Sequence, residues 1–110
     1  MSRIFVALVT LLCVTGASAH TTVSGWQYSS WCCRGGPNGG DCAPIPLRSV
    51  ELRPDGYLVT LQRGDHPLAG AGIQTFLPLG DRGILPSQDL EFHACIVGGK
   101  VRCLYVAFTG

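Results

Sequence analysis

The stretch LEFHACIVGGKVRCLYVAF, from Leu90 to Phe108, is the part of the sequence that decides the fold. Its two halves are rich in β-branched and aromatic residues, and the glycine-containing segment 98–100 between them is a turn signal. We therefore predict an antiparallel hairpin here. A three-residue loop would place Cys95 opposite Cys103, whereas a two-residue loop would place Arg102 there, and the sequence leaves both registers open.

Weaker strand signals precede this hairpin. We predict a second hairpin over Ser49–Leu61, because apolar runs flank the turn signal Pro54-Asp55-Gly56. Residues 73–77 are a candidate short strand. The extended, turn and loop segments that we expect between these pieces are 43–46, 64–67, 80–83 and 85–89.

Helix signals are almost absent from the sequence. Glycine and proline are frequent, and no stretch of ten residues has a sustained helical period, so we expect at most one helical turn, within 65–75 or 84–90. The predicted fold is mainly β: a small single antiparallel domain of about two hairpins, stapled by disulfides, after a signal peptide.

Residues 1–19 have the pattern of a secretory signal peptide. A charged start with Arg3 precedes the apolar run Ile4–Val14, and Ala17-Ser18-Ala19 supplies the small residues that a signal peptidase recognises. The run is too short to cross a bilayer, which takes roughly twenty residues. We expect Sec-type cleavage after Ala19, one domain over residues 20–110, and a secreted or periplasmic location with no membrane attachment after cleavage.

The charge of the remaining chain argues against a polyanionic partner. The sequence has 7 acidic and 8 basic residues, and loss of Arg3 with the signal peptide leaves the two signs balanced. Domains that bind nucleic acids carry a basic surface that neutralises phosphates. We therefore expect no nucleic-acid partner, and we expect instead an unidentified protein or small ligand.

Five cysteines lie beyond residue 19, namely Cys32, Cys33, Cys42, Cys95 and Cys103. Short exported chains usually form disulfides, each worth roughly 2–4 kcal/mol. Several pairings are open, and we expect Cys33–Cys42 and Cys95–Cys103. Because neighbours in an extended chain point to opposite faces, Cys32 is expected in a different environment from Cys33. As the odd cysteine, Cys32 is then expected to link two chains into a homodimer.

A metal-binding or thiol-redox role is the alternative interpretation of the same cysteines. Cys32, Cys33 and Cys42 are close in the sequence, but their spacing differs from that of zinc modules, and exported thiols tend to oxidise. The weak metal candidates among the histidines are His20, His66 and His93. We expect His66 to be solvated in a turn and His93 to be a partly buried, hydrogen-bonded strand residue, and we predict no cofactor.

Residues with catalytic potential form no motif. Most aspartates stand beside glycine in turns, where Asp is favoured for backbone reasons, and no serine lies in a nucleophile elbow. We therefore do not expect an enzyme. Trp26, Tyr28 and Trp31 have two interpretations, either a binding surface for a sugar or peptide or the lid over a small core, and both stay open.

A sparse pattern extends over most of the chain beyond residue 19. It comprises G-W-x-Y-x-x-x-C-C-x-G from Gly25, D-C at 41–42, P-D-G-Y at 54–57, S-x-D-x-x-x-H-x-C from Ser87 and C-L-Y-V at 103–106. In this pattern the chain resembles a group of short exported cysteine-containing proteins of alphaproteobacteria, notably rhizobia. The resemblance implies a bacterial periplasmic or secreted location and brings no activity with it.

These observations favour one functional class over another. We expect a secreted or periplasmic, disulfide-stabilised protein that serves as a non-enzymatic binding or structural module. A metal-binding or thiol-redox protein that uses Cys32, Cys33 and Cys42 is the alternative.

Overall fold

The computed structural model describes residues 21–33 and 40–107. The expected signal peptide with its cleavage site after Ala19, the candidate ligand His20 and most of the glycine-rich segment between Cys33 and Cys42 lie outside these residues. Within the described residues, no helix is long and apolar enough to cross a membrane.

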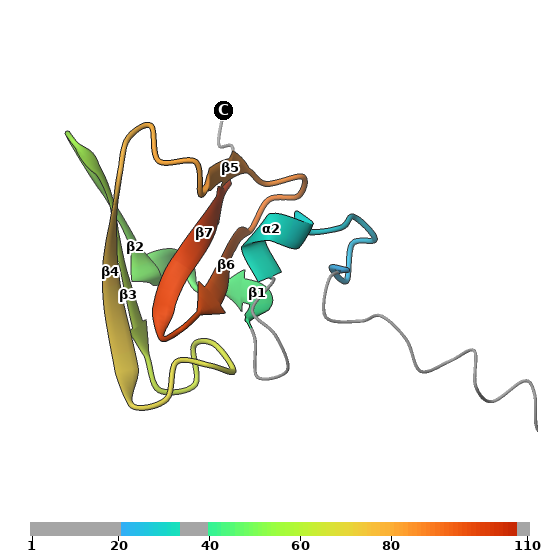
Figure 1. Cartoon of the computed structure of the whole chain (residues 1–110), viewed down its shortest axis with the longest axis horizontal. Helices are drawn as coiled ribbons and strands as arrows, with labels where there is room; N and C mark the ends of the chain where they lie inside the picture. The colour runs from blue at the N-terminus through green and yellow to red at the C-terminus, as the bar shows by residue number, and fades with distance from the viewer. Residues whose placement is uncertain (1–20, 34–39, 108–110) are drawn as a thin grey trace, which may run out of the picture.

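The described chain is mainly β, as the sequence predicts (Figure 1). A helical turn precedes the strands, and their bounds are α2 Ser30–Cys33, β1 Asp41–Ile45, β2 Val50–Arg53, β3 Gly56–Gln62, β4 Gly72–Pro78, β5 Ile84–Pro86, β6 Phe92–Val97 and β7 Lys100–Val106. A 3₁₀ turn at Leu47–Ser49 joins β1 to β2. One sheet has the strand order β1-β6-β7-β5, and the other has the order β2-β3-β4. In Figure 1 the four-stranded sheet lies between the three-stranded sheet and α2, so the fold has three layers.

The β6–β7 hairpin closes with the shorter of the two predicted loops. Val97 is opposite Lys100, so the loop consists of Gly98 and Gly99. Their φ angles are 63° and 79°. Two successive residues with positive φ form the tight turn that matches the twist of paired strands, and glycine adopts them without strain.

A β-bulge then restores the pairing that the longer loop would have given. Ile96 is opposite Val101, but Cys95 is opposite Cys103, so Arg102 is the extra residue of β7. A bulge lets two consecutive residues of one strand lie against the same face of the sheet. This local geometry brings Arg102 and Cys103 to the side of the sheet that carries α2.

The three-stranded sheet contains the second predicted hairpin. β2 and β3 pair around the turn at Pro54-Asp55, and β4 extends the predicted strand 73–77 by one residue at each end. Gly56 is required at the start of β3, because a Cβ there would overlap the Leu77 carbonyl oxygen and the ring of Phe76.

Three local predictions are wrong. Leu85 and Pro86, at the start of the expected loop 85–89, belong to β5, which pairs in parallel with β7. Cys32 and Cys33, expected in an extended chain, lie in the helical turn α2, where the Cys32 N–H donates to the Ser29 carbonyl at 3.0 Å. The helical turns occur at 30–33 and 47–49 and not within 65–75 or 84–90. In each case contacts with distant strands outweigh weak local preferences.

Two apolar clusters occupy the two faces of the four-stranded sheet. The cluster between the sheets contains Ile45, Val59, Leu61, Ala69, Leu77, Ala94, Ile96, Val101 and Leu104. The cysteine–aromatic cluster, on the α2 side, contains Tyr28, Cys32, Cys33, Cys42, Cys95, Cys103 and Tyr105, bordered by Trp26, Trp31 and Leu85. Successive residues of a strand face opposite sides, so β6 and β7 supply both clusters.

Candidate functional site

The disulfides join different cysteines from those predicted. Cys32 is bonded to Cys103, and Cys42 is bonded to Cys95, so the predicted bridges Cys33–Cys42 and Cys95–Cys103 are wrong. The reason is the position of β1, which pairs with β6 on the side away from β7. Cys42, Cys95 and Cys103 therefore stand in one row across the sheet. Within this row Cys42 is bonded to Cys95. Cys103 is bonded instead to Cys32 of α2.

The two vicinal cysteines of α2 differ in their roles. Cys32 is held in an intrachain disulfide, so the prediction of a homodimer through Cys32 loses its basis. Cys33 is buried and belongs to neither of the two disulfides, and its Sγ donates to the Ser29 carbonyl at 3.5 Å. Burial, and after it the charge of Asp41, raises the pKa of the Cys33 thiol, which favours its less reactive protonated form.

Four rings pack together over the α2 side of the sheet. Trp26 and Tyr28 come from the N-terminal segment, His93 from β6 and Tyr105 from β7, with ring centres between 5.0 and 6.4 Å apart. Aromatic rings attract one another most at such spacing and at inclined angles. Tyr28 is buried and Trp26 half-buried, so these two residues form the lid over a core, one of the two interpretations of the sequence.

A chain of hydrogen bonds runs through this ring cluster. The Tyr28 hydroxyl lies 2.8 Å from His93 Nδ1, and His93 Nε2 lies 2.9 Å from Asp89 Oδ1. An ionised carboxylate only accepts, so Nε2 carries a proton, and Tyr28 donates to Nδ1 when the ring is neutral. Burial, followed by the charge of Asp89, raises the pKa of Tyr28 and keeps its hydroxyl protonated.

Asp89 is the centre of the polar contacts. It accepts from Trp26 Nε1 at 3.0 Å, from Ser24 Oγ at 3.1 Å and from Ser87 Oγ at 2.9 Å. Burial alone would raise its pKa, but hydrogen bonds from His93, the Glu91 N–H and Trp26 hold the pKa of Asp89 well below its ordinary value of 3.8. Asp89 thereby fastens the N-terminal segment to the connection between β5 and β6.

The order of hydroxyl, imidazole and carboxylate is that of a nucleophilic triad, but the burial of these residues assigns them a structural role. Tyr28 is 5% exposed and His93 is 1% exposed. A nucleophile must reach its substrate and lose its proton, and both conditions are unfavourable for a buried tyrosine whose pKa is raised. The chain of bonds holds the segment around Trp26 on the sheet.

Trp31 is placed differently from Trp26 and Tyr28. It is half-buried in α2, and the guanidinium carbons of Arg82 and Arg102 lie 3.9 and 4.2 Å from its ring centre. Both contacts are cation–π interactions. Arg82 is exposed in the turn before β5, whereas Arg102 is the bulge residue of β7. The Nε of Arg102 is buried and has no hydrogen-bond partner among the described residues.

His66 is buried rather than solvated, which corrects the prediction. It is 4% exposed, its Nδ1 accepts from the Leu68 N–H at 3.0 Å, and its Nε2 therefore carries the proton that is donated to the Ala94 carbonyl at 2.9 Å. Burial lowers the pKa of His66, although the bond to Ala94 and the charge of Asp41 act in the opposite direction. The turn at 64–67 places this ring against β6, and in this position both ring nitrogens are hydrogen-bonded.

His93 is hydrogen-bonded in a strand, as predicted, and is more deeply buried than expected. The metal candidates His66 and His93 are both engaged within the protein, and His20 lies outside the described residues. Within 21–33 and 40–107, no three His, Cys, Asp or Glu side chains are placed to hold a metal ion.

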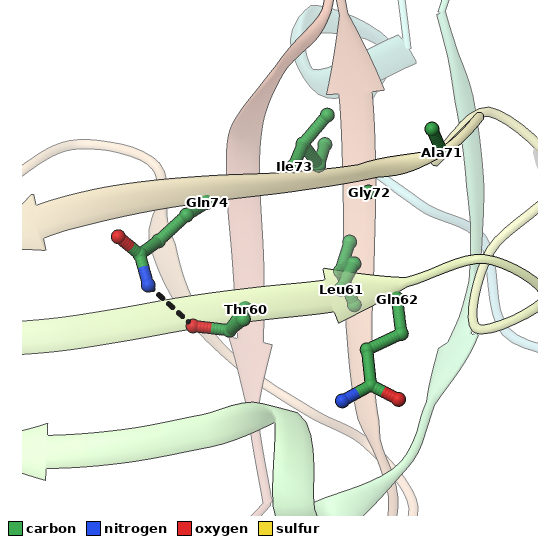
Figure 2. Close-up of a pocket in the computed structure, with 7 residues that line it drawn as sticks. All are labelled: Thr60, Leu61, Gln62, Ala71, Gly72, Ile73 and Gln74. Carbon is green, nitrogen blue, oxygen red and sulfur yellow. Dashed lines mark hydrogen bonds between the residues drawn. The ribbon is translucent and has the colours of Figure 1, made fainter.

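A hollow of about 450 Å³ lies on the three-stranded sheet, away from the ring cluster (Figure 2). Its lining residues are Thr60, Leu61, Gln62, Ala71, Gly72, Ile73 and Gln74. Figure 2 shows Gln74 of β4 donating to the Thr60 hydroxyl of β3, a bond of 2.9 Å. None of these residues is charged or titratable, so the hollow offers shape and amide groups but no acid–base chemistry.

Sequence reasoning identified Trp26, Tyr28 and Trp31 but missed the partners that decide their roles. Tyr105 could have been found, because it is two residues beyond Cys103 on the same strand face. The signals for Asp89 are its spacings from Ser87 and His93 in the pattern S-x-D-x-x-x-H. Arg82 and Arg102 have no local signal.

In comparisons with known proteins, no family model, no curated protein and no solved structure matches this chain.

Proposed function

We propose that the protein is an exported, non-enzymatic binding module whose contact surface is centred on Trp31. The contrast between its two tryptophans carries this proposal. The Trp26 indole N–H is used inside the protein, where it donates to Asp89. The Trp31 indole N–H makes no hydrogen bond with any described residue. It is also not one of the buried polar atoms that lack a partner, so it is accessible to solvent. Trp31 therefore offers an unused donor on a half-buried aromatic side chain to a ligand.

The surroundings of Trp31 suit a binding surface. Aromatic and arginine side chains contribute most of the energy at recognition sites, because they combine large apolar area with directional hydrogen bonds. The Cys32–Cys103 disulfide joins the residue next to Trp31 to the residue next to Arg102. Such covalent support fixes the surface before the ligand arrives and reduces the entropy lost on binding.

Two further observations support the non-enzymatic and exported parts of the proposal. Tyr28, His93 and Asp89 are the residues best suited to acid–base chemistry, and their polar atoms are occupied by one another and by the N-terminal segment. The two disulfides are compatible with an oxidising compartment, and this supports the exported location that the pattern of residues 1–19 predicts.

The test is a binding panel with four ligand classes: neutral oligosaccharides, uncharged peptides, organic carboxylates and inorganic phosphate. Thermal shift and tryptophan fluorescence are measured for the wild-type protein, for Trp31→Ala and for the control Phe76→Ala, which alters an exposed ring on the other sheet. A ligand that binds the wild type and the control but not Trp31→Ala supports the proposal.

Two outcomes would overturn the proposed function. One is that no compound of any class binds, or that binding survives in Trp31→Ala. The other is that a bound compound is recovered chemically changed, because the protein would then be an enzyme.

A further inference from the structure

We infer that the surface formed by Arg82, Trp31 and Arg102 binds an oxyanion, that is, a carboxylate, sulfate or phosphate group of its ligand. This inference rests on the proposed binding surface at Trp31 and specifies its ligand chemistry. Three observations support it, namely two cations without a counter-ion, a buried donor without an acceptor, and the rigid attachment of all three residues.

The first observation is an unbalanced charge. The guanidinium carbons of Arg82 and Arg102 lie 3.9 and 4.2 Å from the centre of the same indole ring, so two positive charges share one aromatic partner. All acidic side chains of the sequence lie in the described part of the chain, and none of them forms an ion pair with Arg82 or Arg102 there. The neighbouring Asp81 instead uses its Oδ1 to accept from the Gly83 N–H at 2.7 Å. An external anion would neutralise part of this local positive charge.

The second observation is the buried Arg102 Nε, which has no partner among the described residues. Buried donors are almost always hydrogen-bonded, so an exception calls for an explanation. Guanidinium groups bind carboxylates and phosphates through paired N–H bonds, and an Nε–H is one of the donors used in that geometry. Arg102 as a whole is only half-buried, so an oxyanion can approach its guanidinium from the accessible side, and a rotation of the side chain would let Nε donate to it as well.

The third observation is that each of the three residues is anchored by its neighbour in the chain. Trp31 precedes Cys32, and Arg102 precedes Cys103, and these cysteines are bonded to each other. Arg82 precedes Gly83, whose carbonyl accepts from the Leu104 N–H at 2.7 Å. A Cβ on Gly83 would overlap the Arg102 carbonyl, so glycine allows the Arg82 turn to lie directly on β7.

The experiment is a titration with sodium phosphate, sodium sulfate and sodium acetate at constant ionic strength, maintained with sodium chloride. Calorimetry and tryptophan fluorescence are applied to the wild type, Arg82→Gln, Arg102→Met and the matched control Arg63→Gln. Arg63 is an exposed arginine in the turn after β3, and its replacement removes the same charge from another surface. We expect saturable binding that Arg82→Gln weakens about tenfold or more, whereas Arg63→Gln leaves it unchanged.

Several outcomes distinguish the alternatives. The order of affinity among the three anions identifies whether a tetrahedral or a planar oxyanion fits. Absence of saturable binding to the wild type, or equal weakening by Arg63→Gln, would overturn the inference. If a neutral ligand of the panel binds through Trp31 while the anions do not, the inference fails and the proposed function stands. Because Arg82 is exposed, Arg82→Gln gives a result even if Arg102→Met does not fold.

Discussion

Cys95 and Cys103 lie directly opposite each other in the β6–β7 ladder, yet each is bonded to a different cysteine. Cys95 is bonded to Cys42 on its other side, which ties the edge strand β1 to β6. Cys103 is bonded to Cys32, which ties α2 to β7. One disulfide therefore secures the sheet, and the other secures the layer that carries Trp31.

Removal of the second disulfide is expected to release the α2 layer. We expect the Cys32→Ser/Cys103→Ser variant to lose about 2–5 kcal/mol of unfolding free energy. The reason is that two positions 71 residues apart in the sequence are then no longer joined in the unfolded chain. Fluorescence of Trp31 should shift to the red, while far-ultraviolet circular dichroism keeps its β signal.

The comparison variant for this prediction is Cys42→Ser/Cys95→Ser. It should lose a similar amount of unfolding free energy. Below the melting temperature of this variant, α2 and Trp31 should stay packed on the sheet, because the Cys32–Cys103 bond is kept. Equal melting midpoints for the wild type and the Cys32→Ser/Cys103→Ser variant would show that this disulfide does not stabilise the fold.

Asp89→Asn is expected to loosen the N-terminal segment. An amide has one oxygen in place of two, so it cannot accept from His93 and Trp26 in the present arrangement, and we expect a loss of about 1–3 kcal/mol. Chemical denaturation measures this loss. Glu91→Gln is the control, because Glu91 is exposed and near Asp89 in the sequence. If both variants were equally stable, the contacts of Asp89 would be incidental.

His66 is expected to make the protein less stable as the pH falls. Burial lowers its folded-state pKa below the ordinary value of 6.5, so the unfolded chain binds more protons than the native protein in mildly acidic solution. The contribution of His66 is therefore complete above pH 6.5 and is lost as the pH falls from there towards the folded-state pKa. Urea denaturation at several pH values measures this slope.

The His66→Gln variant isolates the effect of this ring. Glutamine does not titrate, so the variant should be less stable at neutral pH and should vary less with pH than the wild type. A variant profile as steep as that of the wild type would assign the pH dependence to other groups.

Gly56→Ala is expected to lower the unfolding free energy more than Gly64→Ala, although Gly64 is the one of these two glycines that has a positive φ. The new methyl group at residue 56 would overlap the Leu77 carbonyl oxygen of the paired strand, and we expect a loss of about 3 kcal/mol. At Gly64 the space is open, so only the cost of the φ of 92° applies, about 1 kcal/mol. Melting curves for the two variants should separate clearly, and the reverse order would contradict this account of the sheet.

The sequence alone sufficed for the elements whose contacts are local. The turns at Pro54-Asp55 and Gly98-Gly99 join strands that are neighbours in the chain, so the residue types in these turns predict both hairpins. The prediction of a mainly β, disulfide-containing domain follows from the same signals. The candidate residues Trp26, Tyr28 and Trp31 could also be selected by type.

Only the tertiary structure decided what those candidates do. β1 pairs with β6 across some fifty residues, and β5 joins β7 in parallel, and neither pairing has a local turn to signal it. The position of β1 redirected both disulfides, and the bulge at Arg102 brought a second cation to Trp31. Such contacts depend on how the whole chain packs, because a strand edge accepts any partner of suitable shape and register.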